Sequence, residues 1–317
     1  MPETKAHAQP DDSLLLQPSS RHGPDGGLRI GPSLGQADRG FGHDVALLPP
    51  HHVRRYRLGN KTDRADADAL LEAGRNKQIL PVPVKTVGQH VLTALHSSRA
   101  AWITTRTRRL NILRGILREL GLTISAGPRR VLPAVADALA GESVPTELHP
   151  VLLAFCDEIR RLEENIRLAD RRLAALSKEI PAAKSLQSIP GIGLLTSTAL
   201  LGFVGSASRF RSSRRFASFL GLVPKEFSSG NNRHLGAITK RGDSYLRTLL
   251  IHGGRAVLLS AKRSKTPDRL QSWALQVEKR RGHNRTATAL ANKLARIAWA
   301  VWSKQTVYEP RTLSPCT

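Results

Sequence analysis

Apolar residues recur at alternating steps of three and four over four heptads in the middle of this chain. The members are Leu152, Phe155, Ile159, Leu162, Ile166, Ala169, Leu173, Leu176 and Ile180. This spacing puts every member on one face of an α-helix and is typical of a coiled-coil seam. The pattern predicts one long helix and leaves open whether its partner is another helix of the chain or a second subunit.

Other segments also have helical periodicity, so the sequence predicts a mainly α fold. A helix is expected from 86 to 120, and its apolar stripe is Leu110, Leu113, Leu117 and Leu120. A shorter one is expected from 63 to 76, with Leu70 and Leu71 on its buried side, and a last amphipathic helix should end near Ser303. Residues 44–48, which precede two prolines, predict a short buried strand.

The two ends of the chain lack such patterns. Residues 1–40 are rich in Pro, Gly, Ser and Asp and have no helical or strand period, so we expect a disordered or out-of-frame segment there. Residues 306–317 are expected to form a loose tail.

A net charge of +24 in 317 residues, with a pI near 11.3, predicts a polyanionic partner, above all nucleic acid. The excess is concentrated: thirteen Lys or Arg lie between Gly205 and Lys265, against the two acids Glu226 and Asp243. Aromatic residues make up only 4% of the chain, which argues against base-stacking platforms. Binding should therefore depend on Arg and Lys.

The two cysteines, Cys156 and Cys316, lie far apart, which excludes a disulfide framework or a zinc finger and fits a reducing cytoplasm. The N-terminus does not resemble a signal peptide. Residues 185–208 are uncharged, but Pro190 and four glycines leave an apolar stretch too short to cross a bilayer. We therefore expect a cytoplasmic protein without a membrane span.

Two groups of residues could bind a metal ion or phosphate. Asp63 and Asp66 share one face of a helix start and could hold Mg²⁺, although acids in a first turn are also favoured by the helix dipole alone. Gly191 and Gly193 lie in a predicted helix–hairpin–helix, whose backbone amides could approach a DNA phosphate, although such turns are common for structural reasons. Four arginines follow it and strengthen the DNA-binding interpretation: Arg209, Arg211, Arg214 and Arg215.

A pair of hydroxyls lies inside the basic segment. In one interpretation Ser228 or Ser229 attacks phosphorus and forms a phosphoserine, while neighbouring cations stabilise the developing charge. In the other, Ser-Ser-Gly is ordinary turn chemistry. The neighbouring cations that could contact nucleic acid are Arg233, Lys240, Arg241 and Arg247.

Taken together, these motifs resemble the insertion-sequence one-ten/eleven-eleven family of transposases over about residues 41 to 305. The residues that carry the resemblance are 61–67 (KTDRADA), the coiled coil, 189–193 (IPGIG), 219–224 (FLGLVP), 228–230 (SSG), 238–243 (ITKRGD) and 291–300 (ANKLARIAWA). The resemblance implies residues 41–84 as a remnant of an α/β RuvC/RNase H-like domain, 85–182 as coiled-coil helices and 183–305 as a helical C-terminal transposase domain.

The resemblance also implies a mechanism. It makes Ser228 the nucleophile, with Ser229 in reserve, and Asp63 and Asp66 the third and fourth of four acids that bind Mg²⁺. It implies oligomers, here through the coiled coil, that act on double-stranded DNA with a structured guide RNA, in a prokaryotic cytoplasm near the nucleoid. The expected activity is a DNA recombinase that cuts and rejoins strands.

One departure from the family pattern is informative. The first aspartate strand and the later Glu-Ala-Cys-like stretch of the family have no counterpart before Asp44, so we expect a truncated or frame-disrupted copy with impaired transposition. Two alternatives follow: a non-catalytic nucleic-acid-binding remnant, or a nuclease of the Holliday-junction type that uses the acids and not the serine.

Overall fold

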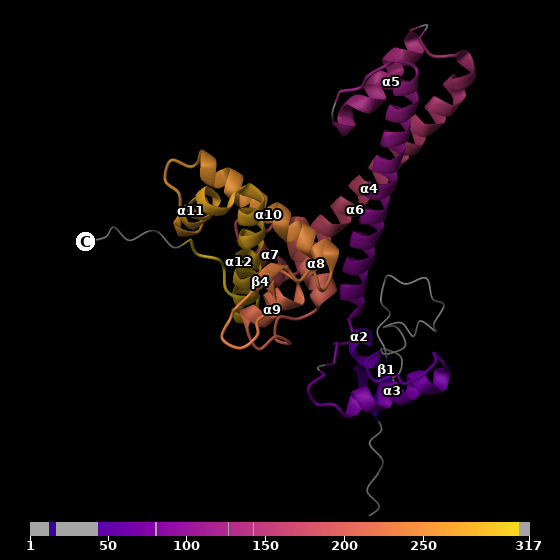
Figure 1. Cartoon of the computed structure of the whole chain (residues 1–317). Helices are drawn as coiled ribbons and strands as arrows, with labels where there is room; N and C mark the ends of the chain where they lie inside the picture. The colour runs from indigo at the N-terminus through magenta and orange to yellow at the C-terminus, as the bar shows by residue number, and fades with distance from the viewer. Residues whose placement is uncertain (1–12, 17–43, 80, 126, 142, 311–317) are drawn as a thin grey trace, which may run out of the picture. The chain divides into compact units, whose positions relative to one another are not determined.

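The computed structural model describes residues 13–16, 44–79, 81–125, 127–141 and 143–310. The chain divides into two compact units, residues 1–87 and 88–317. The boundary between the units lies close to the one expected at 84. The segments 85–182 and 183–305, which were expected to be separate, lie in one unit. Helices dominate the second unit, and the fold as a whole is mainly α, as the periodicity predicts (Figure 1).

The first unit combines a small parallel sheet with two helices. Strand β1 (Ser13–Leu16) pairs in parallel with β2 (Asp44–Leu47), which the two prolines end as predicted. Helix α2 (Pro50–Val53) and helix α3 (Asp63–Arg75) follow, and the Thr62 hydroxyl caps α3 by accepting the Ala65 N–H at 3.2 Å. A small apolar core forms from Leu48, Val53, Ala69, Ala73 and Ile79.

Two expectations for this unit need correction. Residues 13–16 form a strand where no regular structure was expected; the rest of segment 1–40 lies outside the described residues. Leu71 is 55% exposed, whereas Ala69 and Ala73 are buried with Leu70 packed beside them. Since successive helical residues are about 100° apart, a stripe centred on Ala69 and Ala73 turns Leu71 toward solvent.

The second unit begins with a long antiparallel helical hairpin. Helix α4 (Val87–Glu119) pairs with α6 (His149–Glu179), and α5 (Val131–Ala140) packs at the turn between them (Figure 1). Short 3₁₀ turns at Pro128–Arg130 and Thr146–Leu148 flank α5. From Leu152 to Leu173 the members of the predicted seam are buried, except Phe155, which is half-buried beside the buried Cys156. Ion pairs to α4 show that this helix of the same chain lies alongside α6.

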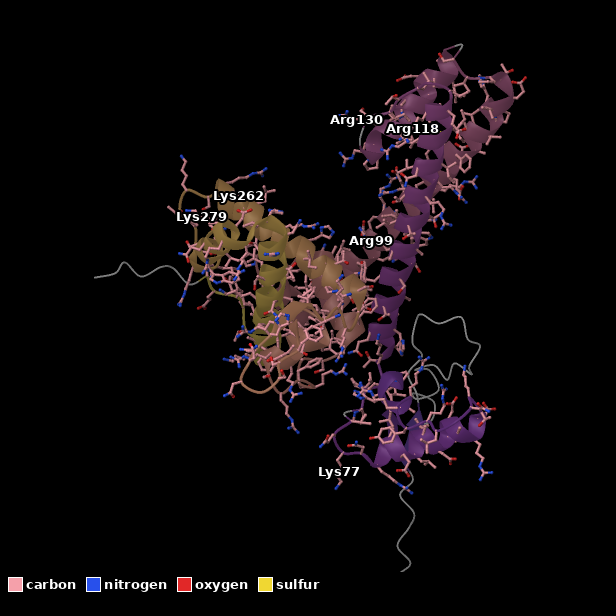
Figure 2. All side chains as sticks on the ribbon, viewed as in Figure 1. Lys77, Arg99, Arg118, Arg130, Lys262 and Lys279 are labelled. Carbon is pink, nitrogen blue, oxygen red and sulfur yellow. The ribbon has the colours of Figure 1, made fainter. Side chains whose placement is uncertain are left out.

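Arginines occupy the middle of the seam on α4. Arg99, Arg106 and Arg109 pair with Asp170, Glu163 and Glu158 of α6 at 2.6, 3.9 and 2.7 Å (Figure 2 labels Arg99). As the residue numbers of the arginines increase along α4, those of their acidic partners decrease along α6. The two helices therefore run antiparallel. Leucines close the seam toward α5, where Leu110, Leu113 and Leu117 are buried.

The remaining helices form a bundle. They are α7 (Pro181–Gln187), α8 (Leu194–Val204), α9 (Ser213–Phe219), α10 (Ser244–Arg263), α11 (Arg269–Arg281) and α12 (His283–Lys304). Helix α12 packs against α7, α9, α10 and α11. Nearly all of α8 is buried, which explains why its sequence is uncharged. Among the described helices, none is long and apolar enough to cross a membrane.

A buried polar network joins the hairpin to the bundle. His96 of α4 is fully buried; its Nδ1 lies 3.0 Å from the Tyr245 hydroxyl and its Nε2 lies 2.9 Å from the Thr198 hydroxyl. Burial, helped by the charge of Arg99, lowers the pKa of His96 to about 4. The imidazole is therefore neutral at neutral pH and links α4, α8 and α10 through hydrogen bonds.

Candidate serine hairpin and basic surface

Ser228 lies on an exposed β-hairpin between α9 and α10. Strand β3 (Pro224–Glu226) pairs antiparallel with β4 (Leu235–Ile238), and we call residues 224–238 the serine hairpin. The backbones of Ser229 and Asn232 exchange hydrogen bonds of 3.3 and 3.2 Å around Gly230 at its tip. The hydroxyl pair therefore lies on a tight turn, as the Ser-Ser-Gly sequence predicts.

The base of the serine hairpin is fixed by two glycines in close contact with backbone. Gly221 and Gly242 have φ values of +70° and +85°. A Cβ on Gly221 would overlap the carbonyl oxygen of Arg241, and one on Gly242 would overlap that of Phe219. Only glycine fits both the backbone conformation and the space, so these residues allow the end of α9 to lie close to the segment that precedes α10.

The Ser228 hydroxyl has a carboxylate partner. Its Oγ donates to Glu226 Oε1 at 2.9 Å and accepts the backbone N–H of His234 at 3.2 Å. Arg233 Nε donates to the same Glu226 oxygen at 3.3 Å. A carboxylate beside a hydroxyl can accept its proton as the hydroxyl attacks, so this arrangement suits a nucleophile.

Glu226 was not among the residues that the motifs singled out. It is the only acidic residue between Ile180 and Gly242, and it lies two positions before Ser228 in an extended segment. Residues two apart in a strand share a face, so this isolated acid could have been paired with Ser228 from the sequence.

The predicted DNA-contacting cations fall into two groups. Arg211, Arg214, Arg215, Lys240 and Arg241 are exposed, and none of them has an acidic partner among the described residues. Arg233 is also exposed but pairs with Glu226. The five unpaired side chains are therefore open to solvent and to a phosphate backbone.

Two arginines have structural contacts instead. Arg209 donates to the carbonyl oxygen of Val204 at 3.3 Å and lies over the rings of Phe210 and Phe219, 5.0 and 5.1 Å from their centroids. Burial lowers its pKa. Arg247 donates to the carbonyl oxygens of Leu220 and Arg241 at 3.4 and 3.3 Å. Arg247 thus stabilises the backbone at the base of the serine hairpin, and Arg209 stabilises the end of α8. That both also bind nucleic acid stays a prediction.

The predicted helix–hairpin–helix is formed by α7 and α8, joined by residues 188–193. A Cβ on Gly191 would lie 2.6 Å from the carbonyl oxygen of Gly253 in α10, so this glycine allows a close backbone contact inside the bundle. Gly193 is exposed, has free space around it and directly precedes α8, whose first turn has no side-chain cap among the described residues. Of the two glycines, Gly193 is the one that can approach a phosphate.

Asp63 and Asp66 lie in the first turn of α3, as predicted. Asp63 is exposed, whereas Asp66 pairs with Arg57 at 3.2 Å. No group of three or more His, Cys, Asp or Glu that could hold a metal exists among the described residues. Mg²⁺ is commonly held by one or two carboxylates and completes its coordination shell with water and phosphate oxygens. Asp63 and Asp66 could supply these two carboxylates if Asp66 released Arg57 and bound the ion instead.

Comparison with known proteins identifies the class of protein that carries this hairpin and basic surface. Residues 183–274 match the family described as "Transposase IS116/IS110/IS902 family", and residues 30–121 match a second family, DEDD_Tnp_IS110, described as "Transposase". The second match begins inside segment 1–40, so family sequence starts earlier than the motifs indicated. Transposases are enzymes that act on DNA.

Curated relatives cover most of the chain. A "Probable family 20 transposase" of Pseudomonas aeruginosa is 38% identical over 86% of this chain and 81% of its own length. The "Transposase for insertion sequence element IS1111A" of Coxiella burnetii is 40% identical over 85% of this chain and 74% of its own. That of element IS1328 from Yersinia enterocolitica is 35% identical over 84% and 79%. The chain belongs to the IS110/IS116 family of transposases.

Proposed function

We propose that this transposase cuts and rejoins DNA through a covalent intermediate on Ser228. The observation that carries the proposal is the hydrogen bond from the exposed Ser228 hydroxyl to Glu226, inside a surface of exposed cations. Ser229 is equally exposed, but its hydroxyl has no hydrogen bond to a carboxylate within the described part of the chain. Ser228 is therefore the nucleophile that the geometry favours.

The step proceeds by transesterification. A bond forms between Ser228 Oγ and phosphorus while the bond from phosphorus to one bridging strand oxygen breaks. The serine proton passes to Glu226, and the leaving oxygen takes a proton from water. Arg233, Lys240 and Arg241 supply positive charge to the phosphoryl oxygens. A DNA hydroxyl then attacks the phosphoserine and releases the serine, so each broken phosphodiester is replaced without an external energy source.

We also propose that Asp63 and Asp66 hold Mg²⁺ as part of a metal site. When bound, the ion stabilises negative charge on a phosphoryl oxygen as a Lewis acid. The exposed Asp63 would bind first, because Asp66 must give up its contact with Arg57. Manganese relaxation measurements on the full chain test this: Asp63→Asn should weaken binding, and Asp68→Asn, an exposed neighbour outside the pair, should not.

The proposed partners are double-stranded DNA, a structured guide RNA and further copies of this chain. The exposed cations of residues 211–241 support a nucleic-acid partner. Exposed apolar residues on α4 and α6, among them Val91, Leu153 and Leu168, leave apolar surface on the coiled coil for a second copy. RNA that co-purifies with the chain, and a mass above one chain by light scattering, are the expected results.

Covalent capture of DNA tests the main proposal. The chain is mixed with a nicked duplex of the element's own end, denatured and analysed for protein that migrates with labelled DNA. Ser228→Ala should abolish capture, Glu226→Gln should slow it by about 10²- to 10⁴-fold, and Ser229→Ala should retain it. Cleavage that survives Ser228→Ala but not Asp63→Asn would indicate a nuclease, and binding without capture in the parent chain would indicate a non-catalytic remnant.

A further inference from the structure

Phe227 is the only exposed aromatic residue among those the structure describes. Its side chain is 63% exposed, whereas the other described Phe, Tyr and Trp residues are buried or half-buried. A phenylalanine loses favourable burial free energy in such a position, so its exposure requires an explanation. It immediately precedes Ser228 on the serine hairpin.

The ring is held in place and does not simply extend into solvent. The Phe227 N–H donates to the carbonyl oxygen of His234 at 2.9 Å, and the two ring centroids are 6.4 Å apart. Opposite the ring lies Gly236, where a Cβ would come within 3.1 Å of Phe227 Cε2. Glycine at 236 thus lets the ring rest across the neighbouring strand with the rest of its surface open.

The surface around the ring has the charge of a DNA-binding site. Lys225 lies two residues before Phe227 and, like the ring, lies against Gly236. Lys240 and Arg241 follow β4 in the chain, and all three cations are exposed. Leu235 on the facing strand adds a second exposed apolar side chain, at 46%. Basic residues attract a phosphate backbone, whereas an apolar protein partner would gain little from them. A two-stranded hairpin is also marginally stable alone in water, so the serine hairpin is expected to gain order when a partner covers it.

We propose that Phe227 stacks on a nucleobase of the DNA next to the phosphate that Ser228 attacks. The ring would enter the base step beside that phosphate, as apolar wedge residues do, and would hold the sugar-phosphate backbone against the serine hydroxyl. The inference rests on the proposed function of Ser228. The low aromatic content argues against a platform of several stacked bases, but a single exposed ring is enough to stack on one base.

Fluorescence of 2-aminopurine tests the stacking separately from the chemistry. Duplexes of the element's own end carry 2-aminopurine in place of adenine at successive positions around the exchange site, and they are titrated with the Ser228→Ala chain, which cannot form the covalent link. Base opening and stacking should change the fluorescence at one or two adjacent positions only. Adding Phe227→Ala should remove the change and weaken binding roughly 5- to 150-fold, as for one base–aromatic stack.

Further variants separate stacking from simple apolar contact. Phe227→Trp should retain both the fluorescence change and the affinity, while Phe227→Leu should lose most of both. Leu259→Ala removes a comparably exposed apolar side chain from α10 and should change neither. Circular dichroism of each variant checks that the helical fold is kept.

Several outcomes would overturn the inference. One is no fluorescence change at any position, whether or not the duplex is bound; another is a change that Phe227→Ala does not affect. A fall in oligomer size in Phe227→Ala would assign the ring to a protein interface, and a response only to RNA would assign it to RNA. If Ser228→Ala leaves covalent capture intact, the proposed function fails, while the fluorescence result still reports on the ring.

Discussion

Three arginines of α4 and the cations in and near the serine hairpin carry the same charge in opposite surroundings. Arg99, Arg106 and Arg109 each have an acidic partner on α6. In and near the serine hairpin in the chain, one acid, Glu226, contacts both Arg233 and Ser228. Six exposed cations have no acidic partner among the described residues: Arg211, Arg214, Arg215, Lys225, Lys240 and Arg241. The difference indicates that these three arginines orient two helices, whereas the charge of the hairpin region is exposed to solvent and available to attract a polyanion.

The largest expected effect is the pH dependence of stability that His96 of α4 causes. Burial lowers the pKa of His96 to about 4 in the folded chain, against 6.5 in an unfolded one. The unfolded state therefore binds the extra proton between these values, so stability rises with pH across that window and falls as pH drops from 6.5 to 4. The loss should approach about 3 kcal/mol.

Urea unfolding at about pH 4.5 and about pH 7 measures this loss, with His96→Gln as the comparison. Glutamine can keep polar contacts without titrating, so its stability should vary less between the two pH values. Equal pH dependence in both proteins would contradict the role of His96.

Arg99→Gln gives the next largest effect. It leaves Asp170 without its 2.6 Å partner beside α4, and the Arg99 side chain is only 15% exposed. Because Asp170 is 39% exposed and water can solvate it, the cost in free energy of unfolding should be about 2 kcal/mol, less than for a fully buried pair. The salt dependence of DNA binding should not change, and a shallower slope would show that Arg99 also contacts DNA.

The double variant Arg214→Gln/Arg215→Gln should have the opposite effects: little change in stability and a change in the salt dependence of DNA binding. Both side chains are exposed on α9, so the free energy of unfolding should change by less than about 0.5 kcal/mol. The slope of log K against log salt should become shallower by about one for each phosphate that an arginine no longer neutralises. Binding titrations between about 50 and 200 mM salt measure it, and an unchanged slope would remove these arginines from the DNA-binding surface.

Arg209→Gln should have the smallest combined effect on stability and DNA binding, and it distinguishes a structural arginine from a DNA-binding one. Arg209 lies in the basic segment but stacks on Phe210 and Phe219. The substitution should cost about 1 kcal/mol of stability, because it removes the cation–π interaction, and leave the salt slope unchanged. A shallower slope with unchanged stability would move Arg209 from the structural group to the DNA-binding group.

Much of the fold could be predicted because local patterns determine it. The seam from Leu152 to Ile180 predicts α6, the prolines after Leu47 end β2, and Thr62 and Asp63 mark the start of α3. The partner of α6 could not be predicted, since any helix with a matching stripe satisfies the seam. The strand at Ser13–Leu16 was missed because four residues without alternation give no period, and parallel pairing depends on a distant segment.

The sequence by itself determined the mainly α class, the basic segment and the position of Ser228 within it, because periodicity and charge are properties of the chain. Tertiary structure decided which charges are free. Folding brought rings and carbonyl oxygens to Arg209 and Arg247, while the pairing of β3 with β4 brought Arg233 and the His234 N–H to Glu226 and Ser228. A residue's availability depends on what packs against it, and packing joins residues that the sequence keeps apart.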